Sequence, residues 1–248
     1  MQNPFSPHPV LSADIDKDFD DQSKLDLYLL RTPWDARAFG IDTFEIQDPS
    51  EETLKAIVPL LKPGHYMVKV DPRSPKKVLH ECGFYYCDTL IEPYCTAQSL
   101  IKLQNDQLNL SKQVSLENLL AICDGAFTHG RFHRDFNIDR KLADERYNLW
   151  LIDIYHSGNF FGLMYADELA GFMGFSGSKL ILHALHKKYR GMGLSKYFWI
   201  LCCEQLFSVG HDEISSSISA SNLPALNLYV SLGFRFRNSL DYYHRLIE

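Results

Sequence analysis

A glycine-rich turn between a strand and a helix restricts the fold of this 248-residue chain more than any other feature. Residues 179–185 before it form a short apolar run, typical of a buried strand. In the turn itself, Gly191 and Gly193 allow the backbone to approach a ligand closely. Apolar residues then recur three and four positions apart, as on one face of a helix: Leu194, Phe198, Leu201, Cys202 and Leu206. The sequence therefore predicts a strand–turn–helix unit.

This turn is suited to holding an anion. The first amides of a helix have no partner within it, and the helix dipole favours negative charge there. Arg190 adds a positive charge at the start of the turn. A diphosphate fits such a site, but a tight connection without a ligand would use the same residues, so the turn alone leaves both interpretations open.

A second strand and helix follow the first unit. Residues 213–219 alternate as a strand does, and a proline in the first turn of the next helix is well tolerated. That helix is expected to run to about Leu232 and to stop at Gly233. Asn222 then lies at the N-cap, where it can bond backbone amides or a ligand.

These two segments resemble the acetyl-CoA-binding half of the GNAT superfamily of N-acetyltransferases. Residues 189–193 match its pyrophosphate loop, and Asn222-x-x-Ala225-x-x-x-Tyr229-x-x-x-Gly233-Phe234 matches its second cofactor motif. Ser195 departs from the glycine or alanine common in the family, but serine is small enough to leave the backbone path open. The resemblance implies an α/β (α+β) GNAT fold with a mixed, largely antiparallel sheet.

The resemblance also implies a cofactor site, with acetyl-CoA as cosubstrate and no metal. The amides of residues 192–196 are expected to hold the diphosphate, and Asn222 to contact the pantetheine arm. The residues expected around the cofactor are Leu185, Arg190, Gly191, Met192, Gly193, Leu194, Ser195, Lys196, Asn222 and Ala225.

Tyr229 is the expected general acid, because the family places this tyrosine near the sulfur and a phenol can protonate the departing thiolate. This role requires that the ring reach the sulfur rather than lie sealed in the interior. The resemblance also implies that a backbone amide around Leu185 stabilises the oxyanion. For the general base, His183 and Glu168 are both candidates and a water chain is a third; His183 could equally be a hydrogen-bonded histidine in a strand.

A stretch upstream mixes aromatic and basic side chains. Such side chains can stack on a ring and bind phosphate, and Arg131, Phe132 and His133 are the expected acceptor contacts. The helix after Asp139 is expected to pack apolar residues inward: Leu142, Tyr147, Leu149 and Trp150. The segment 126–150 as a whole resembles acetyltransferases similar to TDP-fucosamine acetyltransferase, which act on nucleotide-linked amino sugars.

The first hundred residues extend this resemblance. Residues 34–40 resemble the Trp-x-x-x-x-Phe-Gly opening of that group, whose members carry a small amino-terminal domain. Residues 79–90 can be aligned with residues 229–240, with both Gly-Phe pairs in register and Leu90 on Leu240. The first copy is either a degenerate GNAT half or a chance match. A polar stretch at 104–109 suggests a small N-terminal α/β domain at 1–107 and a catalytic domain at 108–248.

Further elements of the second domain can be read from caps and alternation. Ser115 is a plausible N-cap for a helix with an apolar face. Residues 160–165 and 169–175 indicate an antiparallel hairpin.

Bulk composition excludes few classes of protein. A net charge of -6 and a pI near 5.9 give no reason to expect nucleic-acid binding. Six cysteines without metal-ligand spacing are expected to be reduced. The polar, proline-rich segment Met1–Ser12 does not resemble a leader peptide, and no stretch is long enough to span a membrane, so a cytoplasmic location is expected.

The sequence thus predicts an N-acetyltransferase whose acceptor is a small primary amine, best matched by a nucleotide-linked aminodeoxy sugar of surface polysaccharide synthesis. Another small amine, a peptide amine, or acyl-CoA binding without turnover are the alternatives. Residues 242–247 form an apolar strand that offers either an edge for a homodimer or a strand within its own sheet.

Overall fold

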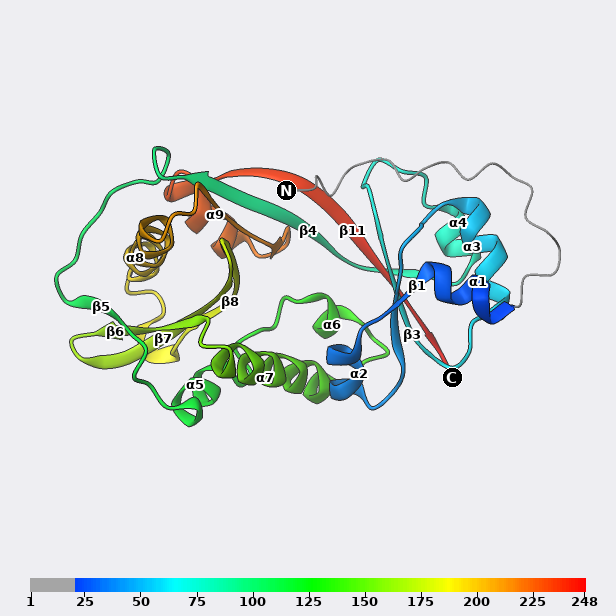
Figure 1. Cartoon of the computed structure of the whole chain (residues 1–248), viewed down its shortest axis with the longest axis horizontal. Coiled ribbons are helices and arrows are strands. Elements are labelled where there is room, and N and C mark those ends of the chain that lie inside the picture. The colour runs from blue at the N-terminus through cyan, green and yellow to red at the C-terminus, as the bar shows by residue number, and fades with distance from the viewer. Residues whose placement is uncertain (1–20) are drawn as a thin grey trace.

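The computed structural model describes residues 21–248, so the expectation for Met1–Ser12 lies outside the described residues. One mixed sheet runs through the molecule in the order β1-β2-β3-β11-β4-β9-β8-β7-β6-β5, with β10 paired to β4 (Figure 1). The strands are β1 (Leu29–Arg31), β2 (Thr43–Ile46), β3 (Gly64–Val70), β4 (Tyr85–Thr96), β5 (Leu108–Ser111), β6 (Phe160–Tyr165), β7 (Glu168–Ser176), β8 (Lys179–Leu185), β9 (Glu213–Ser216), β10 (Ile218–Ser219) and β11 (Arg235–Ile247). Most strand pairs are antiparallel, with β2–β3 and β8–β9 parallel, so the expected mixed sheet is confirmed.

Helices cover both faces of this sheet. They are α1 (Asp21–Tyr28), α2 (Pro33–Phe39), α3 (Glu51–Ile57), α4 (Lys77–Glu81), α5 (Leu116–Cys123), α6 (Arg131–Arg134), α7 (Arg140–His156), α8 (Ser195–Ser208) and α9 (Leu223–Ser231), with 3-10 turns η1 (Val58–Leu60) and η2 (Lys187–Tyr189). In the C-terminal half, α8 and α9 pack on one face and α5 and α7 on the other (Figure 1). The N-terminal half has its own core, formed by α1, α3, α4 and the strands beside them.

Most predicted elements of the C-terminal half are confirmed. The apolar run 179–185 is β8, and the helix after the glycine turn is α8. The Ser115 hydroxyl accepts a hydrogen bond from the Asn118 amide and caps α5. Residues Ala166 and Asp167 adopt positive φ angles of 47° and 66°, which closes the β6–β7 hairpin. The predicted linker at 104–109 is partly wrong, because its last two residues already belong to β5.

The repeat read from the sequence has a counterpart in three dimensions. After α4, the Phe84 amide donates to the Leu79 carbonyl at 2.8 Å; after α9, the Phe234 amide donates to the Tyr229 carbonyl at 3.1 Å. The intervening Gly83 and Gly233 have φ angles of 76° and 88°, so both helices end in the same left-handed cap. The following strands, β4 and β11, pair antiparallel and bring Leu90 opposite Leu240, the two residues that the alignment matches.

The two halves of the chain exchange these long strands. Strand β4, which follows the helix of the first half, pairs with β9 of the second half. Strand β11, which follows the helix of the second half, pairs with β3 of the first half over seven residue pairs. Figure 1 shows both strands running across the middle of the molecule. Because β11 has a partner on each side, the prediction that residues 242–247 offer an edge is wrong and the alternative, a strand inside its own sheet, is confirmed.

Two other expectations concern what the described part of the chain contains. Each of the six cysteines is a free thiol, as expected for reduced cysteines. Among the helices at residues 21–248, none combines the length and the apolar character needed to cross a membrane.

Candidate active site

The parallel strands β8 and β9 separate soon after they meet. Their pairing comprises only Lys179 with Ser215 and Leu180 with Ser216. Strand β8 continues to Leu185, while β9 ends at Ser216. The sheet is therefore parted between residues 181–185 and the segment that leads to β10, directly before the glycine-rich turn.

The turn itself presents free backbone donors. Gly191 and Gly193 have φ angles of 77° and 73°, and a Cβ at either position would meet no atom within 4 Å, so backbone conformation rather than space requires glycine. Among the described residues, the amides of 192–196 donate to no acceptor. Residues 190–193 are exposed, and Ser195 begins the 14-residue α8. The predicted anion cradle is thus free to bind a ligand.

Arg190 fixes the turn to the preceding strand. Its Nε donates to the Leu185 carbonyl at 2.8 Å, which leaves the two terminal nitrogens for an anion. Leu185 is itself buried, so only its backbone is offered to a ligand. On α9, the Asn222 side-chain oxygen accepts from the Ala225 amide at 3.3 Å, which confirms the predicted N-cap. Asn222 and Ala225 are both partly exposed.

Tyr229 lies in the interior, contrary to the expectation that its ring reaches an open cleft. Its side chain is 0% exposed and packs in the core between α8, α9 and the sheet. Burial raises the pKa of its phenol above the usual range. The physical reason is that Tyr229 faces the core from α9, where its ring packs edge-on against Phe234.

Three unpartnered polar atoms meet around Tyr229. The Tyr229 hydroxyl, the Trp199 Nε1 and the His183 Nδ1 are buried without a well-aligned hydrogen bond to a described residue, although Ser216 and Trp199 lie close enough to the Tyr229 hydroxyl to oppose the rise in its pKa. The ring centroid of His183 lies 4.8 Å from that of Trp199 and 6.5 Å from that of Tyr229. Buried polar groups usually find partners, so a group of three without any indicates a place where a polar ligand or water belongs.

Neither predicted base has a suitable pKa. Burial lowers the pKa of His183 to about 4, which makes it neutral but only weakly basic near pH 7. Glu168 lies at the start of β7 and is exposed, bonded to Lys188 and to the Tyr189 hydroxyl. The hydrogen bond from Lys188, followed by that from Tyr189, lowers its pKa. Neither residue is a strong proton acceptor in this structure.

Of the three residues expected to contact the acceptor substrate, one is accessible to solvent and two are packed in the protein. Phe132 is 2% exposed and its ring packs edge-on against Phe39 at 5.0 Å. The His133 side chain is 1% exposed, with Nε2 bonded to Asp144 at 3.0 Å. The expectation of direct acceptor contact is therefore wrong for both, since they anchor α6 instead. Arg131 remains partly exposed, and it forms no ion pair or hydrogen bond with the described residues.

A buried carboxylate that the sequence did not single out lies beside the N-terminus of α9. Asp88 on β4 is 0% exposed and its Oδ1 accepts from Arg134 Nη1 and from the Ser219 hydroxyl, both at 2.8 Å. Its Oδ2 has no partner among residues 21–248. Burial raises the pKa of Asp88, although the bond from Ser219 and the charge of Arg134 oppose the shift. No sequence motif marks this aspartate, because its setting depends on the exchange of β4 into the second half.

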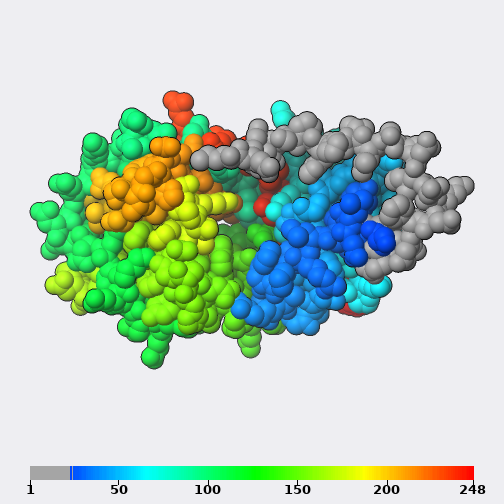
Figure 2. Space-filling view, in the orientation of Figure 1, coloured from blue at the N-terminus to red at the C-terminus, as the bar shows by residue number. Residues whose placement is uncertain are grey.

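The described part of the structure contains two cavities that bear on the candidate site. One, of about 620 Å³, is lined by β3, β4, β9 and β11 and includes Lys69, Ser216 and Tyr242. The other, of about 210 Å³, lies between α2 and α7 and is lined by Trp34, Arg37, Arg146, Trp150 and Asp153. Figure 2 shows the molecule hollowed at its centre, between the yellow-to-orange surface of the C-terminal half and the blue surface of the N-terminal half.

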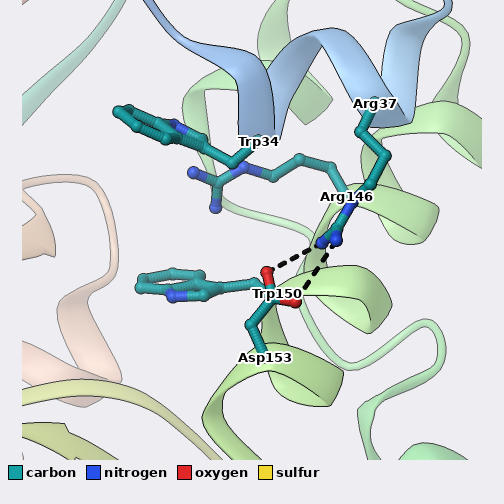
Figure 3. Close-up of a pocket in the computed structure, with 5 residues that line it drawn as sticks. All are labelled: Trp34, Arg37, Arg146, Trp150 and Asp153. Atoms are coloured by element: carbon teal, nitrogen blue, oxygen red, sulfur yellow. Dashed lines mark hydrogen bonds and ion pairs between the residues drawn. The ribbon is translucent and has the colours of Figure 1, made fainter. Parts of the chain in front are cut away.

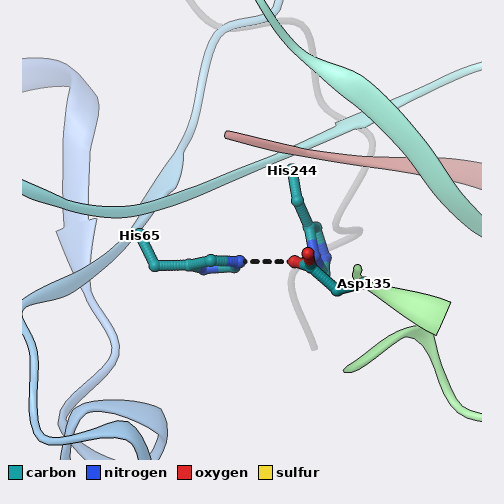
Figure 4. A group of neighbouring side chains, drawn as sticks. All are labelled: His65, Asp135 and His244. Carbon is teal, nitrogen blue, oxygen red and sulfur yellow. Dashed lines mark hydrogen bonds and ion pairs between the residues drawn. The ribbon is translucent and has the colours of Figure 1, made fainter. Parts of the chain in front are cut away.

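The junction of the two halves contains a buried carboxylate–histidine cluster (Figure 4). His65 Nε2 and His244 Nδ1 lie 3.0 and 2.8 Å from the same oxygen of Asp135. The other oxygen accepts from the Tyr85 hydroxyl and from the Asn137 amide, both at 2.9 Å. Burial of Asp135 favours a raised pKa, but the hydrogen bonds from His244 and His65 outweigh burial and lower the pKa of Asp135. Burial lowers the pKa of His244 to about 4.

This cluster has the residue types of a metal site, with three ligand atoms within 4.8 Å of one another. Its geometry is that of hydrogen bonds, because both ring nitrogens lie within donor distance of one carboxylate oxygen. Four donors satisfy the anionic Asp135, and neutral histidines suffice for two of them. The expectation that the chain needs no metal stays a prediction.

Comparisons with known proteins agree with this geometry. Residues 126–234 match the sequence model of a family described as the acetyltransferase (GNAT) family. No protein among the curated sequences matches this chain at a significant level.

Solved structures share the fold at low sequence identity. A GCN5-related N-acetyltransferase from Sphaerobacter thermophilus has a TM-score of 0.58 and 10% identity, covering 88% of this chain and 75% of that one. A functionally unknown conserved protein from Staphylococcus epidermidis has a TM-score of 0.57 and 12% identity, covering 86% and 89%. An acetyltransferase of the GNAT family from Colwellia psychrerythraea has a TM-score of 0.55 and 10% identity, covering 82% and 76%. At these identities the likeness concerns the fold alone.

Proposed function

Since residues 126–234 match the sequence model of the GNAT acetyltransferase family, we propose that this chain transfers the acetyl group of acetyl-CoA to the primary amine of a small acceptor. One observation carries the proposal: the unpaired amides of residues 192–196 lie at the start of α8, next to the place where β8 and β9 part. Donors of this kind bind a diphosphate, and parted strands leave backbone groups for an extended arm. The chain would act in the cytoplasm, where acetyl-CoA is found.

The acceptor that we propose is a nucleotide-linked aminodeoxy sugar of surface polysaccharide synthesis. Two segments support it, residues 34–40 and 126–150, which both resemble acetyltransferases of nucleotide-linked amino sugars. These segments are far apart in sequence, yet Trp34 of the first and Trp150 of the second line the same cavity.

The reaction needs one proton acceptor and one proton donor. The amine nitrogen attacks the thioester carbon and forms the C–N bond, the C–S bond breaks, and the thiolate of coenzyme A leaves. We propose that Tyr229 gives its phenolic proton to that thiolate. The three polar atoms around Tyr229 support this role, and we propose that the pantetheine arm enters between the parted strands as far as the buried hydroxyl.

We propose Asp88, rather than His183 or Glu168, as the acceptor of the amine proton. Burial raises the pKa of Asp88, which brings it closer to the pKa of a useful general base. The Asp88 Oδ2 has no hydrogen-bond partner within the described part of the chain and is therefore able to accept the amine proton. Replacing Asp88 with Asn keeps the shape and the Oδ1 contacts. We expect kcat/KM to fall at least tenfold and the acidic limb of its pH profile to vanish. Ser99→Ala, at an exposed turn, is the control, and an unchanged pH profile in Asp88→Asn would exclude Asp88 as the base.

The burial of Tyr229 favours a second candidate, an acyl-CoA-binding protein without turnover. The two functions separate in one assay, in which folded protein is incubated with acetyl-CoA and a panel of nucleotide amino sugars, free amino sugars and amino acids while thiol release is followed. Release with a nucleotide amino sugar supports the transferase. Calorimetric binding of acetyl-CoA without release for any acceptor supports the second candidate, and no binding of acetyl-CoA excludes both.

A further inference from the structure

The cavity between α2 and α7 has the walls of a site for a flat ring. Trp34 on α2 is 50% exposed, although it is a large aromatic residue. Trp150 on α7 is partly buried, and the Arg146 guanidinium lies over its ring at 4.8 Å. Figure 3 shows both indoles and the Arg146 guanidinium projecting in the same direction, away from the helices that carry them.

Two ion pairs hold these walls in place. Arg146 Nε donates to Asp35 at 2.8 Å, with side chains 11% and 3% exposed. Arg37 makes two bonds to Asp153, which fastens α2 to α7 a second time. The terminal nitrogens of Arg146 have no hydrogen-bond partner among the described residues. The cavity is therefore preformed and keeps a guanidinium edge unoccupied.

A row of stacked side chains leads from this cavity to Asp88. The Arg146 guanidinium lies 5.4 Å from the Phe132 ring, and the Arg131 guanidinium lies 4.5 Å from the same ring. Arg131 also lies 4.9 Å from the ring of Tyr242, which lines the larger cavity and pairs with Asp88 across β11 and β4. Two guanidinium groups with unused donors thus lie between an aromatic cavity and the proposed base.

We infer that this row is the binding site for the nucleoside diphosphate part of the acceptor, an inference that rests on the proposed function. The base stacks against the exposed indole of Trp34, since the Arg146 guanidinium already lies over the Trp150 ring and a nucleobase gains from a free indole face. The diphosphate lies along Arg146 and Arg131, whose planar donor groups suit phosphate oxygens. The amino sugar then points towards Asp88 and the parted strands. Phe132 takes part as the spacer that keeps the two guanidinium groups apart.

Calorimetry on the full chain tests this inference, with UDP, dTDP, GDP and inorganic pyrophosphate as probes. Coenzyme A is present at saturation, so that the probes cannot occupy the cofactor cradle. We expect at least one of these nucleotides to bind the wild-type protein. In Trp34→Ala its affinity should fall about ten- to hundredfold, whereas the affinity for pyrophosphate should not change. Arg131→Gln should weaken both nucleotide and pyrophosphate.

Phe136→Ala is the matched control, since Phe136 is 76% exposed and does not line the cavity. Equal nucleotide binding in Trp34→Ala and wild type would overturn the inference, as would the absence of binding by every nucleotide to protein that binds coenzyme A. Both outcomes leave the transferase proposal standing, because that proposal fails only if acetyl-CoA itself is neither bound nor consumed. With an active nucleotide amino sugar, the inference further predicts a raised KM and a nearly unchanged kcat in Trp34→Ala.

Discussion

Tyr229 and Tyr66 are both buried tyrosines that differ in the state of the hydroxyl. Tyr66 donates to the Lys62 carbonyl at 2.8 Å, whereas the Tyr229 hydroxyl forms no well-aligned hydrogen bond with the described residues. An unpaired buried hydroxyl costs about 1 to 3 kcal/mol, so Tyr229→Phe should unfold at the same or a higher denaturant concentration. If the hydroxyl protonates the thiolate, the same variant should lose about a hundredfold or more in kcat.

Tyr66→Phe is the counterpart, expected to lose about 1 kcal/mol of stability and no activity. Denaturant unfolding and thiol-release kinetics on both variants check this opposition. An unchanged kcat in Tyr229→Phe would leave Tyr229 with a packing role only.

His244 makes stability depend on pH. Its pKa in the folded protein is about 4, below the ordinary value of 6.5, so the folded state binds fewer protons than the unfolded state between these values. The contribution is fully present above pH 6.5 and is lost as the pH falls towards 4. We expect the free energy of unfolding to fall by about 3 kcal/mol over this window.

Urea unfolding at several pH values measures this dependence. The His244→Asn side chain still donates a hydrogen bond to Asp135 but does not titrate. The free energy of unfolding of this variant should therefore depend less on pH between 6.5 and 4. His183 has a similarly lowered pKa, so a residual slope is expected in the variant. Identical slopes in the two proteins would assign the effect to other groups.

At the scale of elements, Gly193 in the turn before α8 can be compared with Gly210 after α8, which is not expected to contact a ligand. Gly193 and Gly210 both have positive φ and enough open space for a Cβ, and they flank the two ends of α8. Alanine at either position costs about 1 to 2 kcal/mol of backbone strain. Only Gly193→Ala distorts the donors of residues 192–196, so its dissociation constant for acetyl-CoA should rise about tenfold while that of Gly210→Ala stays unchanged. Equal affinities in both variants would remove the turn from the cofactor site.

The sequence predicted elements better than it predicted side-chain surroundings. Periodicity and caps located β8, α8, α9 and the β6–β7 hairpin, because each depends on local spacing. The burial of Phe132 could not be foreseen, since it depends on α2, which reaches α6 and α7 from the other half of the chain. His133 is packed against α7 by Asp144 and Tyr147, and no local pattern marks these contacts. Trp150 packs against the core as expected, but it also lines a cavity with Trp34, which the sequence did not predict. Asp88 carries no motif and acquires its environment only when β4 enters the second half.

For the whole molecule, the exchange of β4 and β11 predicts that the halves are not independent. A fragment of residues 108–248 lacks β4, which lies between β9 and β11 in the sheet. Its β11 would expose both edges, so we expect the fragment to be insoluble or unfolded by circular dichroism. Co-expression with residues 1–107 supplies β3 and β4, and the two fragments should co-purify. A cooperative unfolding transition in the isolated fragment 108–248 would contradict this.

Strand β11 also imposes an order on the synthesis of the protein. Tyr243, on β11, belongs to the core of the first half, which otherwise consists mainly of residues before number 85. That core therefore stays incomplete while the ribosome makes the remaining residues, although the N-terminal part of a chain ordinarily folds first. Only when β11 has left the ribosome can it pair with β3 and complete both halves in one step.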